Sequence, residues 1–130
     1  MTQTVNLSAA APVCIVDDDA SMADSTGFLV RSFGFKVKTF SSAQEFLSSG
    51  LVEGGNCVAL ILDLRMPGMD GLQLQRHLTS INRQIPVIFV SAHANEEERR
   101  RAIDRGAVDF LSKPFNEEAL FGALQVALNR

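Results

Sequence analysis

The chain has 130 residues, of which 46% are hydrophobic, and a formal net charge of −3. This length suits one domain with a substantial core, and this hydrophobic content is not that of a disordered chain. The chain has no block of basic residues that would attract nucleic acid, and no apolar stretch long enough to cross a membrane. We therefore expect one globular domain that neither binds nucleic acid directly nor enters a membrane.

The N-terminal residues and the two cysteines indicate where the protein works. Residues 1–11 lack the cationic start and apolar core of a signal peptide, and we expect them to form a flexible tail. Cys14 and Cys57 both lie inside apolar runs, which is typical of reduced core thiols in a cytosolic protein. If those runs are neighbouring strands, the thiols lie close together, but the sequence indicates neither a disulfide bond nor a metal site there. The expected location is the cytoplasm.

The first apolar run is followed by acidic residues and then by a helical pattern. Residues 12–16 predict a short buried strand, after which come three aspartates: Asp17, Asp18 and Asp19. Ser21 and Asp24 are spaced as in a capping box, so we expect a helix from there to Phe33 with Phe28 on its inner face. Asp19 is expected to supply negative charge near the start of this helix.

The segment after this helix predicts an edge strand and a short helix. Residues 35–40 alternate apolar and polar side chains, which is typical of a half-exposed strand at the edge of a sheet. A second capping box at 42–45 predicts a short helix that ends by Gly50.

The central strand of the expected sheet is the run 58–63. It is apolar up to its last residue and is followed by Pro67-Gly68, so it predicts a strand buried on both faces. The strand ends in a carboxylate, Asp63, and ligands of open α/β sheets bind just outside the carboxyl ends of the strands. An isolated aspartate at this point would more often only open a turn. The residues at the other strand ends favour a functional site instead.

The second half of the chain continues the alternation of strands and helices. Residues 86–90 predict a strand that ends in Ser91, and residues 108–112 predict a last strand that ends before Lys113. Between these strands, three glutamates precede three arginines at 96–101, at offsets that allow ion pairs along a helix. This helix is either a solvated, self-stabilised element or a polar face for another protein.

Strict alternation with short connections predicts an α/β fold, a doubly wound parallel sheet of five strands with helices on both faces. The acidic residues favour the strand order 2-1-3-4-5, because it places the first and third strands side by side at a switch point. This order brings Asp17, Asp18 and Asp63 together. Ser91 and Lys113 then lie on the same rim of the sheet.

These side chains suit phosphoryl chemistry. Three neighbouring carboxylates repel one another, and an all-oxygen site with few carboxylates suits Mg²⁺ with some of its waters retained. Such an ion can hold a phosphoryl group against a carboxylate nucleophile. Lys113 can then pair with one phosphoryl oxygen, and the Ser91 hydroxyl can donate to another.

The chain resembles the receiver domain of two-component response regulators over residues 12–130, and that family has a flavodoxin-like fold. The matching motifs are Val16-Asp17-Asp18, Leu62-Asp63, Met66-Pro67-Gly68, Asp70-Gly71, Ser91-Ala92 and Lys113-Pro114-Phe115. The resemblance implies that Asp63 accepts a phosphoryl group from a histidine kinase. It also implies a Mg²⁺ ion held by Asp18 directly, by Asp17 through water, by Asp63 and by the backbone carbonyl of Arg65.

The resemblance also implies how the signal is received and passed on. Lys113 and Ser91 contact the phosphoryl oxygens, and the peptide bond between Lys113 and Pro114 is a candidate cis bond. Phe110 stands at the position of the family's switch aromatic, although the residues alone favour a fixed core side chain. Arg65 and His93 lie two residues beyond Asp63 and Ser91, where we expect them to flank the path of attacking water and tune the dephosphorylation rate.

The motifs at 65–68 and 109–111 resemble the FixJ-like branch of the family. Receivers of this branch usually carry a helix-turn-helix DNA-binding domain, so the resemblance implies transcriptional output through a domain absent from this chain. The alternative is a stand-alone receiver that acts by protein–protein contact. On phosphorylation, we expect a homodimer through the face formed by the fourth helix, fifth strand and fifth helix.

Two further functions remain open. One is a Mg²⁺-dependent phosphohydrolase of the haloacid dehalogenase type, which also uses an aspartate nucleophile at a strand end. That family has a second aspartate two residues beyond the nucleophile as its proton shuttle, and this chain has Arg65 there. The other is a pseudo-receiver that only binds partners, against which the intact acidic set argues. We expect self-phosphotransfer and autodephosphorylation but no enzyme turnover.

Overall fold

The computed structural model describes residues 11–54 and 57–129 and contains one parallel sheet with the strand order β2-β1-β3-β4-β5. The expected tail at 1–11 lies, except for its last residue, outside the described residues. The strands are β1 (Val13–Val16), β2 (Val37–Phe40), β3 (Ala59–Asp63), β4 (Val87–Ser91) and β5 (Asp109–Ser112). The helices are α2 (Ala20–Ser32), α3 (Ala43–Ser48), α4 (Leu51–Gly54), α5 (Gly71–Ser80), α6 (Glu96–Asp104) and α7 (Glu117–Leu128). The predicted fold class and strand order are confirmed.

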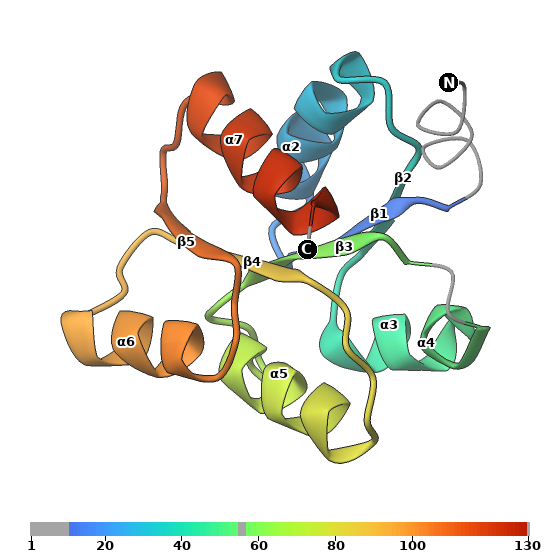
Figure 1. The fold of residues 1–130 in the computed structure, drawn as a ribbon, viewed down its shortest axis with the longest axis vertical. Coiled ribbons are helices and arrows are strands. Elements are labelled where there is room, and N and C mark those ends of the chain that lie inside the picture. Colours follow the sequence, from blue (N-terminus) through green and yellow to red (C-terminus); the bar gives the residue numbers. More distant parts are fainter. Residues whose placement is uncertain (1–10, 55–56, 130) are drawn as a thin grey trace.

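Helices cover both faces of the sheet. Figure 1 shows α2 and α7 together on one face and α3, α4, α5 and α6 on the other. Each face has its own hydrophobic cluster, one centred on Ile15, Ile61 and Leu124 and the other on Leu62, Phe89 and Leu74. The sheet therefore lies between two apolar layers, as the uninterrupted apolar runs of its central strands require.

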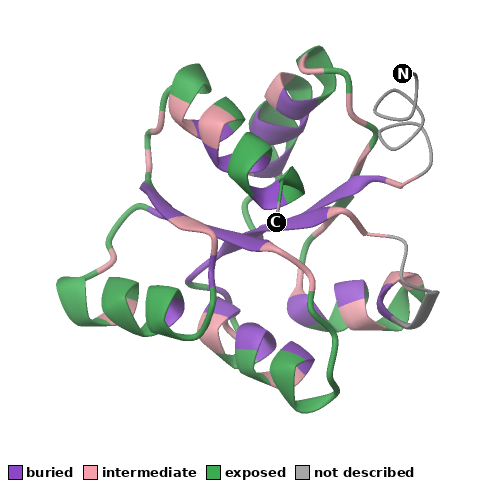
Figure 2. Cartoon of the chain, in the orientation of Figure 1, coloured by how far each residue is buried: buried purple, intermediate pink, exposed green. Residues whose placement is uncertain are grey.

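Burial distinguishes the central strands from the edge strand. All residues of β1, β3 and β4 are buried, whereas those of β2 are partly or fully exposed (Figure 2). The register pairs Val16 with Leu62. The residues that follow this pair, Asp17 and Asp63, therefore leave the sheet side by side at its carboxyl edge.

Helix α2 differs in detail from the sequence prediction. Its N-cap is Asp19, which accepts a hydrogen bond from the Met22 N–H, so the capping box expected at 21–24 is wrong. Phe28 is 72% exposed instead of facing the core, and small residues such as Gly27 lie on the buried side. A Cβ at Gly27 would already touch Val37 at 3.4 Å. The buried stripe of the helix is Ala23, Thr26, Gly27 and Val30, and Phe28 lies outside this stripe.

The segment after β2 also contains one element that the sequence did not predict. Ser42 caps α3 by accepting from the Glu45 N–H at 3.0 Å, as expected. The Glu45 carboxylate, however, accepts from the N–H and the hydroxyl of Ser41 and not from the cap residue. After α3 the chain makes the additional short helix α4.

Helix α6 has little buried surface. Asn95 and Glu98 form a reciprocal capping box at its start, and Ala102 is its one buried residue. The expected ion pairs along the helix are present, with Arg101 2.8 Å from Glu97 and Arg99 3.9 Å from Glu96. Because so little apolar surface anchors it, α6 presents mostly charged side chains to the outside.

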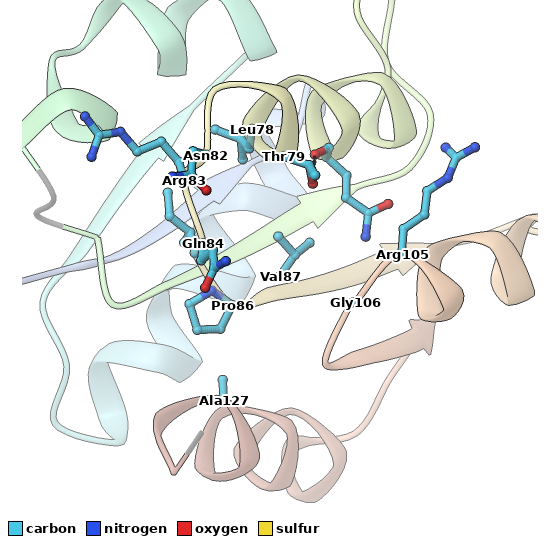
Figure 3. Close-up of a pocket in the computed structure, with 12 residues that line it drawn as sticks. Leu78, Thr79, Asn82, Arg83, Gln84, Pro86, Val87, Arg105, Gly106 and Ala127 are labelled. Atoms are coloured by element: carbon cyan, nitrogen blue, oxygen red, sulfur yellow. Dashed lines mark hydrogen bonds between the residues drawn. The ribbon is translucent and has the colours of Figure 1, made fainter.

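A cavity of about 490 Å³ lies at the amino end of β4, on the opposite edge from the acidic residues. Among its lining residues are Gln75, Arg83, Arg105 and Ala127 (Figure 3). Figure 3 shows Arg83 and Arg105 extending away from each other, so they do not converge on an anion. None of the helices within the described ranges has the length and apolar character needed to span a membrane.

Candidate functional site

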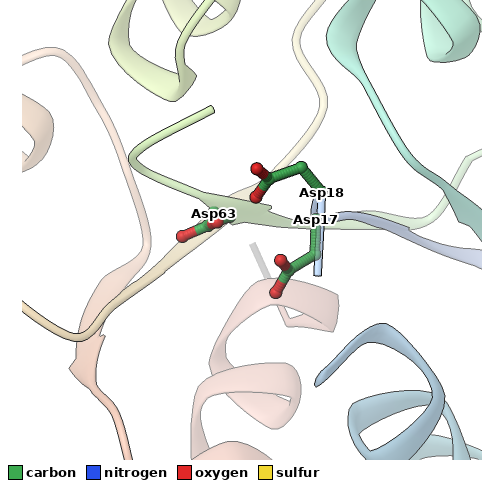
Figure 4. Close-up of side chains that lie close together, drawn as sticks. All are labelled: Asp17, Asp18 and Asp63. Carbon is green, nitrogen blue, oxygen red and sulfur yellow. The ribbon is translucent and has the colours of Figure 1, made fainter. Parts of the chain in front are cut away.

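Three carboxylates gather where β1 and β3 end, as the strand order predicted. Oxygen atoms of Asp17, Asp18 and Asp63 all lie within 4.8 Å of one another (Figure 4). Asp17 is 3% exposed and Asp63 is 6% exposed, while Asp18 is exposed to solvent. The cluster therefore has two buried carboxylates in its floor and one at its mouth, from which a solvated cation can enter.

Lys113 is the cation within the cluster. Its Nζ atom lies 3.1 Å from Asp17 Oδ2 and 3.5 Å from Asp63 Oδ1. Asp17 also accepts the Asp19 N–H on its other oxygen at 2.9 Å, which fixes the orientation of its carboxylate. The peptide bond between Lys113 and Pro114 is cis, as expected.

The electrostatics of the cluster leave room for a further positive charge. Burial raises the pKa of Asp63 to about 6, the negative charge of Asp17 adds to this rise, and the ammonium group of Lys113 opposes it. One ammonium group thus contacts two of the three clustered carboxylates, and the third carboxylate is that of Asp18. The donor set consists of the oxygens of three carboxylates, so these residues fit a hard divalent cation such as Mg²⁺.

Ser91 lies on the same rim and is 2% exposed. It is the last residue of β4, the strand whose Val90 pairs with Asp63. Its hydroxyl oxygen accepts a hydrogen bond from the His93 N–H at 3.3 Å. The hydroxyl is therefore held by the β4–α6 loop on the rim beside the strand that carries Asp63.

Phe110 on β5 is buried, with 6% of its surface exposed, and its ring stacks on that of Phe89 at a centroid distance of 5.8 Å. The side chain of this candidate switch aromatic therefore lies inward in this structure, packed against β4.

A polar network joins the loops on either side of the cluster. The Arg65 guanidinium donates to the His93 carbonyl at 3.2 Å and to the Glu98 carboxylate at 2.7 Å. Glu98 also accepts the Asn95 N–H at 3.1 Å as part of the helix cap. Arg65 and His93, which the sequence predicted separately, are thus brought together. The part played by Glu98 was missed, because its sequence signal is only that of a capping residue.

Gly71 packs directly against the strand that carries Asp63. A Cβ at this position would lie 2.6 Å from the Asp63 carbonyl oxygen and 2.9 Å from the Phe89 ring. Only glycine allows α5 to start this close to β3. The sequence analysis included Gly71 in a motif but did not identify this packing requirement.

Comparison with known proteins agrees with this geometry. The family model for the response regulator receiver domain matches residues 13–125. The response regulator protein TodT of Pseudomonas putida is 47% identical over 119 residues, which are 92% of this chain and 52% of TodT. The transcriptional regulatory protein FixJ of Bradyrhizobium diazoefficiens is 35% identical over 118 residues, which are 91% of this chain and 57% of FixJ.

A solved structure shows the same fold. The crystal structure of FixJ-N superposes with a TM-score of 0.83 at 35% identity, covering 92% of this chain and 94% of that one. The chain therefore belongs to the receiver-domain family of two-component response regulators, and its relatives include transcriptional regulators. The chain spans about half the length of TodT and FixJ.

The raised pKa of Asp63 predicts a pH-dependent stability. Its value moves from 3.8 to about 6 on folding, so the native state retains a proton that the unfolded state releases between these values. As pH rises through this window, Asp63 destabilises the native state by about 3 kcal/mol in total. In urea unfolding without Mg²⁺, Asp63→Asn should match wild type near pH 4 and be more stable by about this amount at pH 7. An equal difference in the free energy of unfolding at both pH values would contradict this.

Proposed function

We propose that this receiver is a phosphorylation switch in which Asp63 accepts a phosphoryl group from a sensor histidine kinase. The observation that carries the proposal is the position of Lys113, with its Nζ atom 3.1 Å from Asp17 and 3.5 Å from Asp63 inside the carboxylate cluster. A strand-end carboxylate with a neighbouring ammonium group and two acidic partners combines a nucleophile with the charge neutralisation that phosphoryl transfer needs.

The cation that this site suits is Mg²⁺. We assign Asp18 and Asp63 as direct ligands, Asp17 as a ligand through water, and the Arg65 backbone carbonyl as a further ligand. When bound, Mg²⁺ neutralises charge on the phosphoryl oxygens. The buried carboxylate of Asp17 keeps its orientation through the Asp19 N–H, so the residues of the site are positioned before the cation arrives.

The transfer step uses the chain's own side chains. A carboxylate oxygen of Asp63 forms a bond to the phosphorus atom as the bond from phosphorus to the kinase histidine nitrogen breaks. Lys113 pairs with one phosphoryl oxygen, and the Ser91 hydroxyl donates to another. Hydrolysis of the aspartyl phosphate later returns the site to its starting state.

The switch begins at Ser91. Its hydroxyl oxygen accepts the His93 N–H at 3.3 Å, so the His93 backbone follows when the hydroxyl turns to donate to a phosphoryl oxygen. The β4–α6 loop therefore responds first, and α6 follows because little apolar surface anchors it. We assign Phe110 to hold the inward position against Phe89 in the phosphorylated state.

The output is proposed from the relatives. TodT is named a response regulator protein and FixJ a transcriptional regulatory protein, and each is about twice as long as the matched segment. We propose that this receiver controls a DNA-binding effector domain, while the receiver itself contacts proteins and not DNA. A receiver that acts alone through protein–protein contact is the second possibility.

One experiment separates the switch from the two other functions. The chain is incubated with acetyl phosphate and Mg²⁺, and intact mass and free phosphate are measured. A switch gains one phosphoryl group per chain. A phosphohydrolase releases phosphate catalytically without keeping it, and a pseudo-receiver does neither, so either of these results would overturn the proposal.

The contacts of Arg65 with His93 and Glu98 are expected to affect the lifetime of the phosphoryl group. Arg65→Gln breaks the contacts to His93 and Glu98 but keeps the backbone carbonyl, and we expect a several-fold change in dephosphorylation rate with Mg²⁺ affinity nearly unchanged. Exchanging His93 should have a similar effect, because its side chain lies two residues beyond Ser91 in the loop that Arg65 contacts, where we expect it to flank the path of attacking water. Phosphate release after removal of acetyl phosphate measures the rate.

The matched control for these variants is Arg99→Gln, which removes an arginine from α6 whose partner, Glu96, is 3.9 Å away and outside the network. It should dephosphorylate like wild type. Equal phosphoryl half-lives in all of the variants would refute the assigned role of Arg65 and His93.

Activation should promote a homodimer through the face formed by α6, β5 and α7. This face includes the three glutamates and three arginines of α6, which suit pairing with a second copy. Coupling of about 1–3 kcal/mol, typical of allosteric switches, corresponds to roughly a 5–150-fold gain in dimer affinity. Analytical ultracentrifugation with beryllofluoride, which mimics the phosphoryl group, measures this gain.

Variants test whether Ser91 and Phe110 couple the phosphorylation site to the face formed by α6, β5 and α7. Ser91→Ala and Phe110→Ala should lose the gain in dimer affinity, whereas Phe28→Ser, on the exposed surface of α2, should respond like wild type. Activated wild type that stays monomeric at high concentration, or switch variants that still dimerise, would reject this route.

A further inference from the structure

A chain of hydrogen bonds links the Ser91 hydroxyl to the start of helix α6. The Ser91 hydroxyl oxygen accepts the His93 N–H at 3.3 Å. The His93 carbonyl in turn accepts a hydrogen bond from Nη2 of Arg65 at 3.2 Å. The same Nη2 atom donates to Oε1 of Glu98, in the first turn of α6, at 2.7 Å. One guanidinium group therefore joins the β4–α6 loop to the helix that follows it.

Glu98 is itself fixed on the helix by a second set of contacts. The Oε1 atom that binds Arg65 also accepts the Asn95 N–H at 3.1 Å, and the Asn95 side chain accepts the Glu98 N–H at 2.8 Å. Only 20% of the Glu98 side chain is exposed, so water screens its attraction to Arg65 less than that of a fully exposed pair. The other two ion pairs described for α6 join residues of the helix itself. Glu98 is therefore the residue through which the charge of α6 reaches the loops around the site.

The two ends of α6 are held by different contacts. Near its end, Ala102 is 0% exposed, and its carbonyl accepts a hydrogen bond from the Gln75 side-chain amide of α5 at 3.1 Å. Gln75 is 4% exposed, so this contact is buried between the two helices. In the first turn no residue is buried, and the polar contact with another element is that of Glu98 with Arg65. A movement of the β4–α6 loop can therefore tilt the start of the helix while its end stays in place.

We propose that Glu98 is a positioning residue that, through Arg65, makes the start of α6 move with the β4–α6 loop when Ser91 binds the phosphoryl group. The inference rests on the proposed function and adds a route from the site to α6 that does not pass through Phe110. The Phe110 ring packs on Phe89 of β4, whereas the contacts of this second route lie in the loops. Because coupling is reciprocal, a partner that holds the start of α6 in its present position resists the movement of Ser91.

Hydrogen exchange of the backbone amides tests the proposal. The chain is kept at a concentration at which sedimentation shows a monomer, and Mg²⁺ and beryllofluoride are added until exchange around Asp63 no longer changes. In wild type, exchange in the first turn of α6 should then rise several-fold, because this turn is pulled against an end that stays fixed. Exchange around Ala102 should stay close to its value without beryllofluoride.

Variants separate the contacts of Arg65 from the helix cap. Arg65→Gln breaks the contacts to His93 and Glu98 but leaves the cap, so the first turn should no longer respond to beryllofluoride. Glu98→Ala should lose the response as well. The matched control is Asn95→Ala, which removes the capping side chain but keeps Glu98 on Arg65. Its first turn should exchange faster at rest and still respond, and Phe110→Ala should also still respond.

The outcomes distinguish this inference from the proposed function. A full response of the first turn in Arg65→Gln and Glu98→Ala would overturn the inference, and so would a wild type that responds around Asp63 but not in α6. Loss of the response in Phe110→Ala would show that the signal passes through the ring and not through Glu98. If the proposed function itself were wrong, wild type would show no response to beryllofluoride even around Asp63, and the inference would fail with it.

Discussion

The Asp63→Asn variant is expected to lose all incorporation of a phosphoryl group from acetyl phosphate. The amide keeps the size of the side chain but lacks the nucleophilic carboxylate oxygen. The fold should persist and gain stability at neutral pH, because burial and the charge of Asp17 make ionised Asp63 unfavourable. Intact mass spectrometry in the presence of Mg²⁺ measures incorporation, and circular dichroism checks the fold.

The control for this variant is Asp24→Asn, which makes the same chemical change at an exposed position on α2. It should take up the phosphoryl group like wild type. The assignment of Asp63 as acceptor would be wrong if Asp63→Asn were still labelled stoichiometrically.

Loss of Mg²⁺ binding in Asp18→Ala is the second large effect. Asp18 is the exposed member of the carboxylate cluster and the proposed direct ligand at its mouth. Without it, Lys113 and the two buried carboxylates remain, and affinity should fall more than tenfold, a loss of over about 1.4 kcal/mol. Because one of three repelling charges is gone, the variant without Mg²⁺ should also melt at a higher temperature. Titration calorimetry measures the affinity.

The matched control is Asp19→Asn. This change removes the adjacent negative charge but keeps a side-chain oxygen that can accept the Met22 N–H and cap α2. Its Mg²⁺ affinity should stay close to wild type. Wild-type affinity in Asp18→Ala would show that Asp18 is not a ligand, and an equal loss in both variants would show that the effect is general electrostatics and not ligation.

The sequence predicted the sheet and the acidic cluster because both depend on strong local patterns. The apolar runs of the central strands could only be buried on both faces, and each ended in a polar residue of the later site. Once the strand order followed from Asp17 and Asp63, the register had to bring these residues together. The site at this edge of the sheet could therefore be predicted without knowledge of how the side chains pack.

The parts that failed depend on packing between elements. Phe28 was placed inside because aromatic residues are usually buried, but the helix turns Gly27 toward the strands, and Phe28 lies outside its buried stripe. Asp19 took the role of N-cap two residues earlier than the pattern around Ser21 suggested. A local pattern does not reveal how near two elements lie.

Polar contacts between residues far apart in the sequence could not be predicted from local patterns either. The ion pair of Arg65 with Glu98 joins residues 33 positions apart, and neither residue signals its partner. The same holds for Gly71, whose requirement arises from contact with the Asp63 backbone.

The most direct test of the central claim is to locate the phosphoryl group by chemical reduction. Borohydride converts an aspartyl phosphate into homoserine, and the tryptic peptide 39–65 contains Asp63 as its single aspartate, while Asp17 and Asp18 lie in another peptide. After incubation with acetyl phosphate and Mg²⁺, we expect homoserine at position 63 in wild type. Homoserine at Asp17 or Asp18, or in no peptide of a phosphorylated chain, would contradict the account.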